Sequence, residues 1–213
     1  MILPALTTER LLLRPFTAAD GAIHDLVYGD PEVAVPFAGG VRTPEETREW
    51  LVCRMVQARV DELGFWALER RDDAALLGLA ALQAYVAEWI VWPDDPEPRH
   101  NRIEVEYGYA LGRQFWGHGY VTEAGHAVVD YAFGRLRLPR LAYAVDGANA
   151  RSIGVMRRLG FRRVDNLHPD GLVTSIDLVS SEKQSAGVIL GMTLGKSGML
   201  KREVEEPVQS KDE

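Results

Sequence analysis

Cysteine is nearly absent from this sequence, because Cys53 is the single cysteine among 213 residues. One thiol cannot form an internal disulfide, and it excludes zinc sites that are built from several cysteines. Cys53 falls in an amphipathic helical pattern, so we expect a buried, inert thiol rather than a nucleophile.

Long apolar runs and a recognisable export signal are also missing. No run approaches the roughly 20 apolar residues that a transmembrane helix needs. The segment from Met1 to Pro4 lacks the charged and apolar regions of a secretory signal. We therefore expect a cytoplasmic protein with no membrane partner.

An excess of basic charge is missing as well, since the formal net charge is −7. This balance argues against general nucleic-acid binding, and we expect no nucleic-acid partner. The charge is unevenly placed, however: eight arginines and one acid lie between Arg135 and Arg163. Such a stretch suits an anionic ligand, although arginines that only solvate helix faces would look the same.

The apolar periodicity predicts a mixed α/β domain with a central sheet over residues 1–180. The expected strands are 10–16, 65–71, 76–86, 102–111, 141–145, 161–164 and 171–179. The expected helices are 17–27, 43–64, one from about 121, and 150–159. Residues 28–31 have turn chemistry. Residues 181–213 have little periodicity, and we expect a tail outside the core that is partly disordered.

The stretch RQFWGHGYVTEA at 113–124 lies between an expected strand and an expected helix. Gly117 and Gly119 allow close approach of the backbone, and the free N–H groups of a helix N-terminus favour an anion. The dinucleotide fingerprint does not fit, because its third glycine and its acidic ribose partner are missing. The pattern therefore predicts a different phosphate-binding loop.

Several motifs together resemble the GNAT family of N-acetyltransferases. Q-x-x-G-x-G-Y-x-T-E-A after E-x-G-Y-x-L is similar to the coenzyme A pyrophosphate loop of that family. N-A-R-S at 149–152, followed by L-G-F at 159–161, resembles its second motif. T-E-R-L-L-L-R-P at 8–15 and G-D-P-E-V at 29–33 are similar to the subgroup that includes ribosomal-protein alanine acetyltransferases. The likeness covers about residues 7–179.

This resemblance implies a GNAT fold: a mostly antiparallel sheet flanked by helices, with a V-shaped splay between the strands before and after the pyrophosphate loop. It implies acetyl-CoA as co-substrate, no metal, and direct attack by a primary amine in a ternary complex. The acceptor would be a protein N-terminus or a small amine, such as an aminoglycoside or polyamine. The alternative is a catalytically silent acyl-CoA-binding regulatory module. The protein would be a monomer or a homodimer.

The resemblance also assigns cofactor contacts. Backbone N–H groups at 117–120 would hold the pyrophosphate, and the edge of 109–111 would pair with the pantetheine arm like an added strand. The side chain of Asn149 would add one hydrogen bond to that arm. The full expected set is Tyr109, Ala110, Leu111, Gln114, Gly117, His118, Gly119, Tyr120, Thr122, Asn149, Ser152 and Met156.

A catalytic base is needed because an ammonium must lose a proton before it attacks. Glu106 is the first candidate and Glu104 the second, since family members often use a glutamate on this strand; both could instead be solvated or paired with arginine. The family's tyrosine acid is replaced by Met156 here. Ser152 remains as the proton donor to the leaving thiolate, although it could simply bind backbone in the first helical turn.

The loop 87–102 is a candidate wall for the acceptor. Asp94 and Asp95 would attract a cationic amine, and Trp89 and Trp92 would give apolar contact; a proline-stiffened surface loop is the alternative reading. A helical E-x-x-H at 123–126 lacks the further ligands of a metal site, so we expect no metal.

Overall fold

The computed structural model describes residues 2–86, 103–164 and 175–180. The strands are β1 (Leu6–Thr7), β2 (Leu11–Pro15), β3 (Gly64–Arg70), β4 (Leu76–Val86), β5 (Ile103–Leu111), β6 (Arg140–Val145), β7 (Arg162–Val164) and β8 (Ser175–Ser180). The helices are α1 (Pro31–Ala38), α2 (Pro44–Gln57), α3 (Tyr120–Asp130) and α4 (Ala150–Arg158). Shorter 3-10 or π-helical turns are Asp20–Ala22, His24–Tyr28, Arg113–Phe115 and Tyr131–Arg135.

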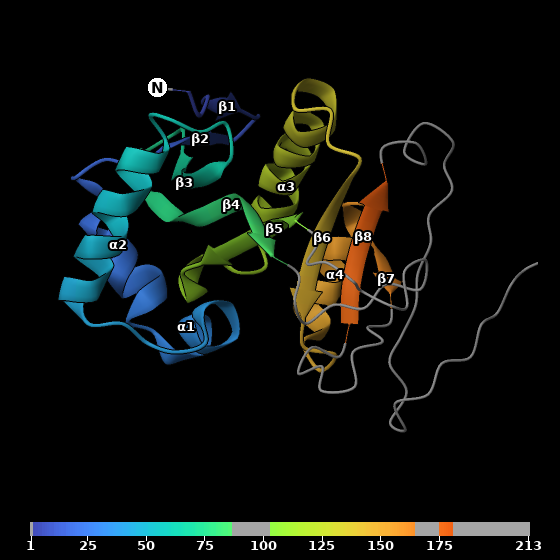
Figure 1. The fold of residues 1–213 in the computed structure, drawn as a ribbon. Helices are drawn as coiled ribbons and strands as arrows, with labels where there is room; N and C mark the ends of the chain where they lie inside the picture. The colour runs from blue at the N-terminus through green and yellow to red at the C-terminus, as the bar shows by residue number, and fades with distance from the viewer. Residues whose placement is uncertain (1, 87–102, 165–174, 181–213) are drawn as a thin grey trace, which may run out of the picture.

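The strands form one sheet in the order β1-β2-β3-β4-β5-β6-β8-β7. Every neighbouring pair is antiparallel except β5 and β6, which are parallel. That pair has a single registered position, Glu106 opposite Ala142, so the two strands diverge beyond it. Figure 1 shows the consequence: β2–β5 and β6–β8 form two wings, with α1 and α2 beside the first wing. The predicted α/β class, antiparallel character and splay are confirmed.

Local sequence signals set the helix starts. Thr43 and Glu46 form the capping box that the sequence predicts at α2. Helix α1 was not expected, because residues 28–31 were interpreted only as a turn. Asp30 caps it by accepting a hydrogen bond from the N–H of Glu32, and Pro31 fits its first turn. The end of α2 at Gln57 is also earlier than predicted.

Successive side chains along each strand point to opposite faces of the sheet, which gives two separate apolar layers. Phe65, Ala81 and Gly108 are in register across β3, β4 and β5, and so lie on one face. Phe65 and Ala81 belong to the apolar cluster formed with the segments before β3. Tyr107, one residue along β5, belongs to a second cluster that includes residues of α3 and α4. The sheet is therefore covered on both faces.

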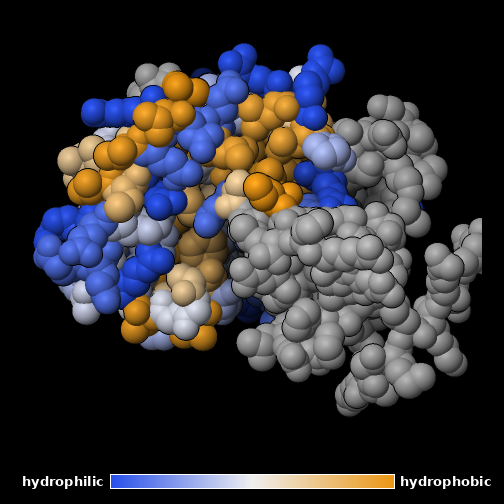
Figure 2. Space-filling model, viewed as in Figure 1, coloured by the Kyte–Doolittle hydropathy of each residue, from blue (hydrophilic) through white to orange (hydrophobic). Residues whose placement is uncertain are grey.

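The surface is mixed, with polar and apolar patches side by side on the face in Figure 2. Cys53 lies on this protein's surface and not in the core, which corrects the expected burial. Its position falls on the outward side of α2, beside the exposed Val52 and Val56.

Within the described ranges, no helix is both long and apolar enough to cross a lipid bilayer.

Candidate active site

A large cleft of about 2270 Å³ runs through the splay of the sheet. Phe65 and Glu106 line it from the face that α1 and α2 cover, whereas Tyr109 and Ser152 line it on the opposite side. Residues from both faces can share one cleft only where the sheet opens. The divergence of β5 and β6 beyond Glu106 provides that opening.

The glycine loop forms one wall of this cleft. Gly117 and Gly119 both have φ of +81°, a left-handed conformation that glycine adopts without strain. Gly119 is the N-cap of α3 and offers no side-chain oxygen to the first N–H groups of the helix. Those groups have no partner within the helix either, so they and the helix dipole face the cleft as an anion site.

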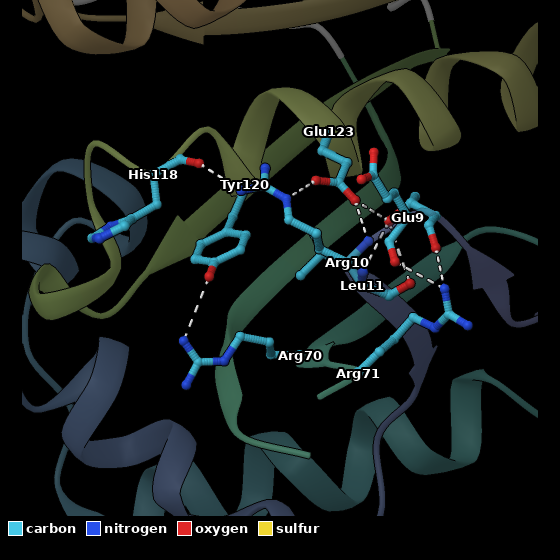
Figure 3. A network of polar contacts seen from close by, with 9 residues as sticks. Glu9, Arg10, Leu11, Arg70, Arg71, His118, Tyr120 and Glu123 are labelled. Atoms are coloured by element: carbon cyan, nitrogen blue, oxygen red, sulfur yellow. Dashed lines mark hydrogen bonds and ion pairs between the residues drawn. The ribbon is translucent and has the colours of Figure 1, made fainter. Parts of the chain in front are cut away.

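An ion pair from outside the loop fixes this helix start (Figure 3). Arg10 donates from Nε to Glu123 at 2.7 Å and from Nη1 to the His118 carbonyl at 3.0 Å. The backbone N–H of Arg10 and the hydroxyl of Thr8 also donate to Glu123. The Arg10 guanidinium lies 4.6 Å from the centre of the Tyr120 ring. Arg10 and Glu123 both line the cleft, so a paired cation and anion lie beside the N-terminus of α3.

Strand β5 presents one open edge next to the loop. Residues 107–111 pair with β4 on one side, but β6 has already diverged on the other. Unpaired N–H and C=O groups of such an edge can bind an extended ligand as an added strand. Tyr109, Ala110 and Leu111 line the cleft as expected. The Leu111 carbonyl already accepts a hydrogen bond from the Trp116 indole at 2.9 Å.

Glu106 is the carboxyl group that faces this cleft from β5. Burial raises its pKa to about 7, although a hydrogen bond from the Ala144 backbone opposes the shift. A carboxyl with this pKa exchanges a proton at neutral pH, as a general base must. Gln83 lies opposite Glu106 on β4 and also lines the cleft.

Glu104 has a different environment two residues away. Its side chain is 3 % exposed, does not line the cleft, and forms a two-point ion pair with Arg140 of β6. The pair joins β5 to β6 near the point where they meet. Glu104 is therefore a carboxylate paired with arginine, which was the alternative to catalysis, and Glu106 stays the candidate base.

Three hydroxyl groups meet on the other side of the splay. Tyr109 donates to Ser152 Oγ at 2.9 Å, and the Tyr109 and Tyr143 rings are stacked with centroids 5.9 Å apart. Tyr143 also shares hydrogen bonds with Ser152 and Tyr109. Burial raises the pKa of both phenols above the usual value, so they stay protonated. Ser152 thus contacts tyrosine hydroxyls beside the cleft, in addition to its place in the first turn of α4.

The other residues expected to bind the cofactor fall into two groups, those that line the cleft and those that do not. Tyr120, Thr122 and Asn149 line the cleft. Asn149 also caps α4, because its Oδ1 accepts a hydrogen bond from the Ser152 N–H at 3.1 Å.

Three expected residues do not line the cleft: Gln114, His118 and Met156. Met156 is fully buried, because its helix position points into the core. Gln114 is exposed, and the His118 ring stacks on the Tyr120 ring with a centroid distance of 5.8 Å. The side chains at these three positions do not reach the cleft wall in this structure, and their contact with a cofactor stays a prediction.

The expected acceptor residues Trp89, Trp92, Asp94 and Asp95 lie outside the described residues, as does the tail 181–213. Among the described residues, no group of three His, Cys, Asp or Glu side chains is placed to hold a metal ion.

Sequence reasoning missed two parts of the site. Arg10 appears in the T-E-R motif, but the motif gave no sign that this residue contacts the glycine loop 108 positions later in the chain. In the sequence, Tyr143 has only the pattern of an ordinary strand residue. Only the register of β6 against β5 brings it to Tyr109.

Comparisons with known proteins agree with this geometry. The family model for the acetyltransferase (GNAT) domain matches residues 10–162. An uncharacterized protein, YkkB, from Bacillus subtilis is 28% identical over 156 residues, which cover 73% of this chain and 83% of that protein. An uncharacterized N-acetyltransferase, p20, from Bacillus licheniformis is 25% identical over 163 residues, covering 74% of this chain and 82% of that protein.

A solved GNAT-family acetyltransferase from Bacillus anthracis has the same fold, with a TM-score of 0.66 at 22% identity. The match covers 84% of this chain and 99% of that structure. The family model spans the glycine loop, the Glu106 strand and the Ser152 helix together. The chain therefore belongs to the GNAT family of acetyltransferases, which use acetyl-CoA and an amine acceptor.

Proposed function

We propose that this protein transfers the acetyl group of acetyl-CoA to a primary amine by direct attack, with Glu106 as the general base. The observation that carries the proposal is the position of Glu106, a carboxyl with a pKa of about 7 in the cleft that also contains the glycine loop. Acetyl-CoA supplies the acetyl group as an activated thioester.

The residues present fit this co-substrate. The N-terminus of α3, with Gly117 and Gly119 in left-handed conformations, suits a pyrophosphate, and Arg10 holds this helix start through Glu123 and the His118 carbonyl. The open edge of β5 at 109–111 suits the amide-rich pantetheine arm.

Glu106 accepts a proton from the acceptor ammonium, directly or through one water. The neutral nitrogen then forms the C–N bond as the C–S bond breaks. A pKa of about 7 serves this step, because the carboxylate is populated at neutral pH and is still a stronger base than an ordinary glutamate.

Ser152 donates the proton that the departing thiolate takes up. Tyr109 then returns a proton to Ser152 through their 2.9 Å hydrogen bond, and the second N–H proton that the acylated nitrogen releases restores the Tyr109 phenol through water in the cleft. This arrangement replaces the family tyrosine, whose position is occupied by the buried Met156.

The acceptor is a protein N-terminus or a small amine. The likeness of residues 8–15 and 29–33 to ribosomal-protein alanine acetyltransferases supports the first. The acidic residues in the sequence of the 87–102 segment favour the second, a cationic acceptor such as a polyamine or an aminoglycoside.

Titration with acetyl-CoA, with and without a panel of primary amines, tests the proposal through the release of free thiol. Amine-dependent thiol release supports it. Binding of acetyl-CoA without thiol release for any amine supports the silent regulatory module instead. Absence of binding contradicts both readings.

A further inference from the structure

Two arginines lie among aromatic rings at the end of the cleft near α2. Arg42 precedes this helix, and its guanidinium carbon is 4.2 Å from the centre of the Tyr28 ring. Arg54, in the last turn of the helix, lies 4.8 Å from the centre of the Phe65 ring. Both are about 6 Å from Trp50, at 6.0 and 5.9 Å. All five residues line the cleft.

Both arginines hold buried donors that are unused within the described part of the chain. Arg42 Nη1 and Arg54 Nε are buried and have no hydrogen-bond partner there. Arg54 does donate from Nη1 to Gln57 at 2.8 Å, which is a neutral acceptor. Buried donors of a charged group are costly to leave unpaired, so such donors usually face a ligand, an ion or water.

Nearby carboxylates are already engaged elsewhere. Glu32 lines the cleft, but it pairs with Arg113 at 2.8 Å. Glu46 is exposed and completes the capping box with Thr43; it attracts Arg42 through charge but forms no hydrogen bond or ion pair with it. Among the described ion pairs, none includes Arg42 or Arg54. Aromatic faces contribute cation–π attraction but cannot accept the in-plane N–H groups.

The arginine end and the catalytic end are joined by one continuous wall. Phe65, Ala81 and Gly108 are in register across three strands, and Glu106 lies two residues from Gly108 on the same face. At about 4.8 Å per strand and 3.4 Å per residue, the backbones of Phe65 and Glu106 are roughly 12 Å apart. A small molecule can span that distance.

We propose that the amine acceptor carries an anionic group, a carboxylate in the first instance, which Arg42 and Arg54 bind together. This proposal rests on the proposed acetyl transfer and names the class of its acceptor. The apolar body of the acceptor packs against Tyr28, Trp50 and Phe65, and its amine reaches Glu106. Polyamines and aminoglycosides lack the anion and would place further positive charge beside the arginines, so they are poor acceptors.

Matched acceptor pairs test this inference. One pair is 4-(aminomethyl)benzoate and 4-(aminomethyl)benzamide; the other is the dipeptide Ala-Phe and its C-terminal amide. The two members of each pair differ only in the anion, and the two pairs separate a small aromatic acid from a peptide end. We expect kcat/KM for at least one acid to exceed that for its amide by about 10-fold or more, as charge-assisted hydrogen bonds are strong.

Arg42→Gln and Arg54→Gln should each raise KM for the preferred acid about 10-fold and remove most of the preference over the amide. KM for acetyl-CoA should not change, which also shows that the variants are folded. Arg48→Gln is the matched control, because Arg48 is an exposed arginine of α2 that pairs with Glu45 and does not line the cleft.

Equal kcat/KM for both acids and their amides overturns the inference, and so does a preference that survives both substitutions. If no amine releases thiol, the proposed acetyl transfer fails, and the anion site is then judged separately by calorimetry with benzoate. Benzoate binding that is lost in the Arg42→Gln/Arg54→Gln double variant retains the anion site. Absence of benzoate binding, or binding unchanged in that variant, rejects it.

Discussion

The phenol of Tyr109 donates a 2.9 Å hydrogen bond to the hydroxyl of Ser152, which joins β5 to the first turn of α4. The bond bridges the splay of the sheet at the cleft. Burial raises the pKa of Tyr109, so the phenol stays protonated and is available to Ser152 in the proposed reaction.

Loss of this proton source should slow turnover. We expect Ser152→Ala to lower kcat about 100-fold, at the low end of the usual range for general acid catalysis, and Tyr109→Phe to lower it about 10-fold because Tyr109 acts only through the serine. Calorimetry should find acetyl-CoA binding by both variants. Tyr131→Phe is the control, since that hydroxyl donates to the Glu62 carbonyl away from the cleft. Equal kcat in wild type and Ser152→Ala would remove the serine from the reaction.

Arg10 should affect the co-substrate and not the acceptor. We expect Arg10→Ala to raise KM for acetyl-CoA about 5-fold to 10-fold, because it leaves the Glu123 carboxylate without its cation beside the proposed pyrophosphate position and removes the hydrogen bond to the His118 carbonyl. Arg71→Ala is the matched control, because Arg71 donates to the carbonyls of Thr8 and Glu9 in the same network but does not line the cleft (Figure 3). Initial-rate kinetics with each substrate varied would detect the split. Equal changes from both substitutions would contradict a direct role for Arg10.

The conformation of the glycine loop can be tested with a single methyl group. Gly117 has φ of +81° and open space around it, so an added Cβ meets no neighbour and only backbone strain results. We expect Gly117→Ala to lower stability by about 1–2 kcal/mol and to weaken acetyl-CoA binding. Gly134 also has open space, without a positive φ, and Gly134→Ala should leave binding intact. Chemical denaturation and calorimetry measure both effects.

Burial of Glu106 should reduce stability at high pH. Its pKa is raised from 4.5 to about 7, so both folded and unfolded states are protonated well below pH 4.5, whereas above pH 7 the folded state bears the cost of a buried charge. We expect Glu106→Gln to be more stable than wild type at pH 8 by up to about 3 kcal/mol, and to gain nothing at pH 4. Thermal unfolding at the two pH values would show this. An equal gain at both values would contradict the raised pKa.

Much of the fold follows from local signals in the sequence. Alternation marks β5, and Thr43 with Glu46 marks the start of α2. Helix α1 was missed because Asp30 and Pro31 also suit a turn, and its interior Pro36 is unfavourable to a helix. Its formation depends on packing of Val33 and Phe37 against the apolar cluster on the sheet, which no local pattern shows.

The site was less predictable wherever it depends on long-range contacts. A few consecutive backbone groups form the phosphate-binding loop, so its glycines Gly117 and Gly119 could be predicted from a local motif. The roles of Glu104 and Glu106 could not be separated by their spacing. Pairing of Arg140 with Glu104 across β5 and β6 distinguishes their environments, and that contact exists only in the folded sheet.

The rate–pH profile of Glu106→Gln is the most direct test of the central claim. For wild type, kcat/KM for the amine should rise with pH through about 7, as Glu106 loses its proton and becomes the base. In Glu106→Gln that rise should disappear and the rate at pH 7.5 should fall about 100-fold, while acetyl-CoA still binds. A variant that keeps the wild-type rate and the same profile across pH 6–9 would contradict the account.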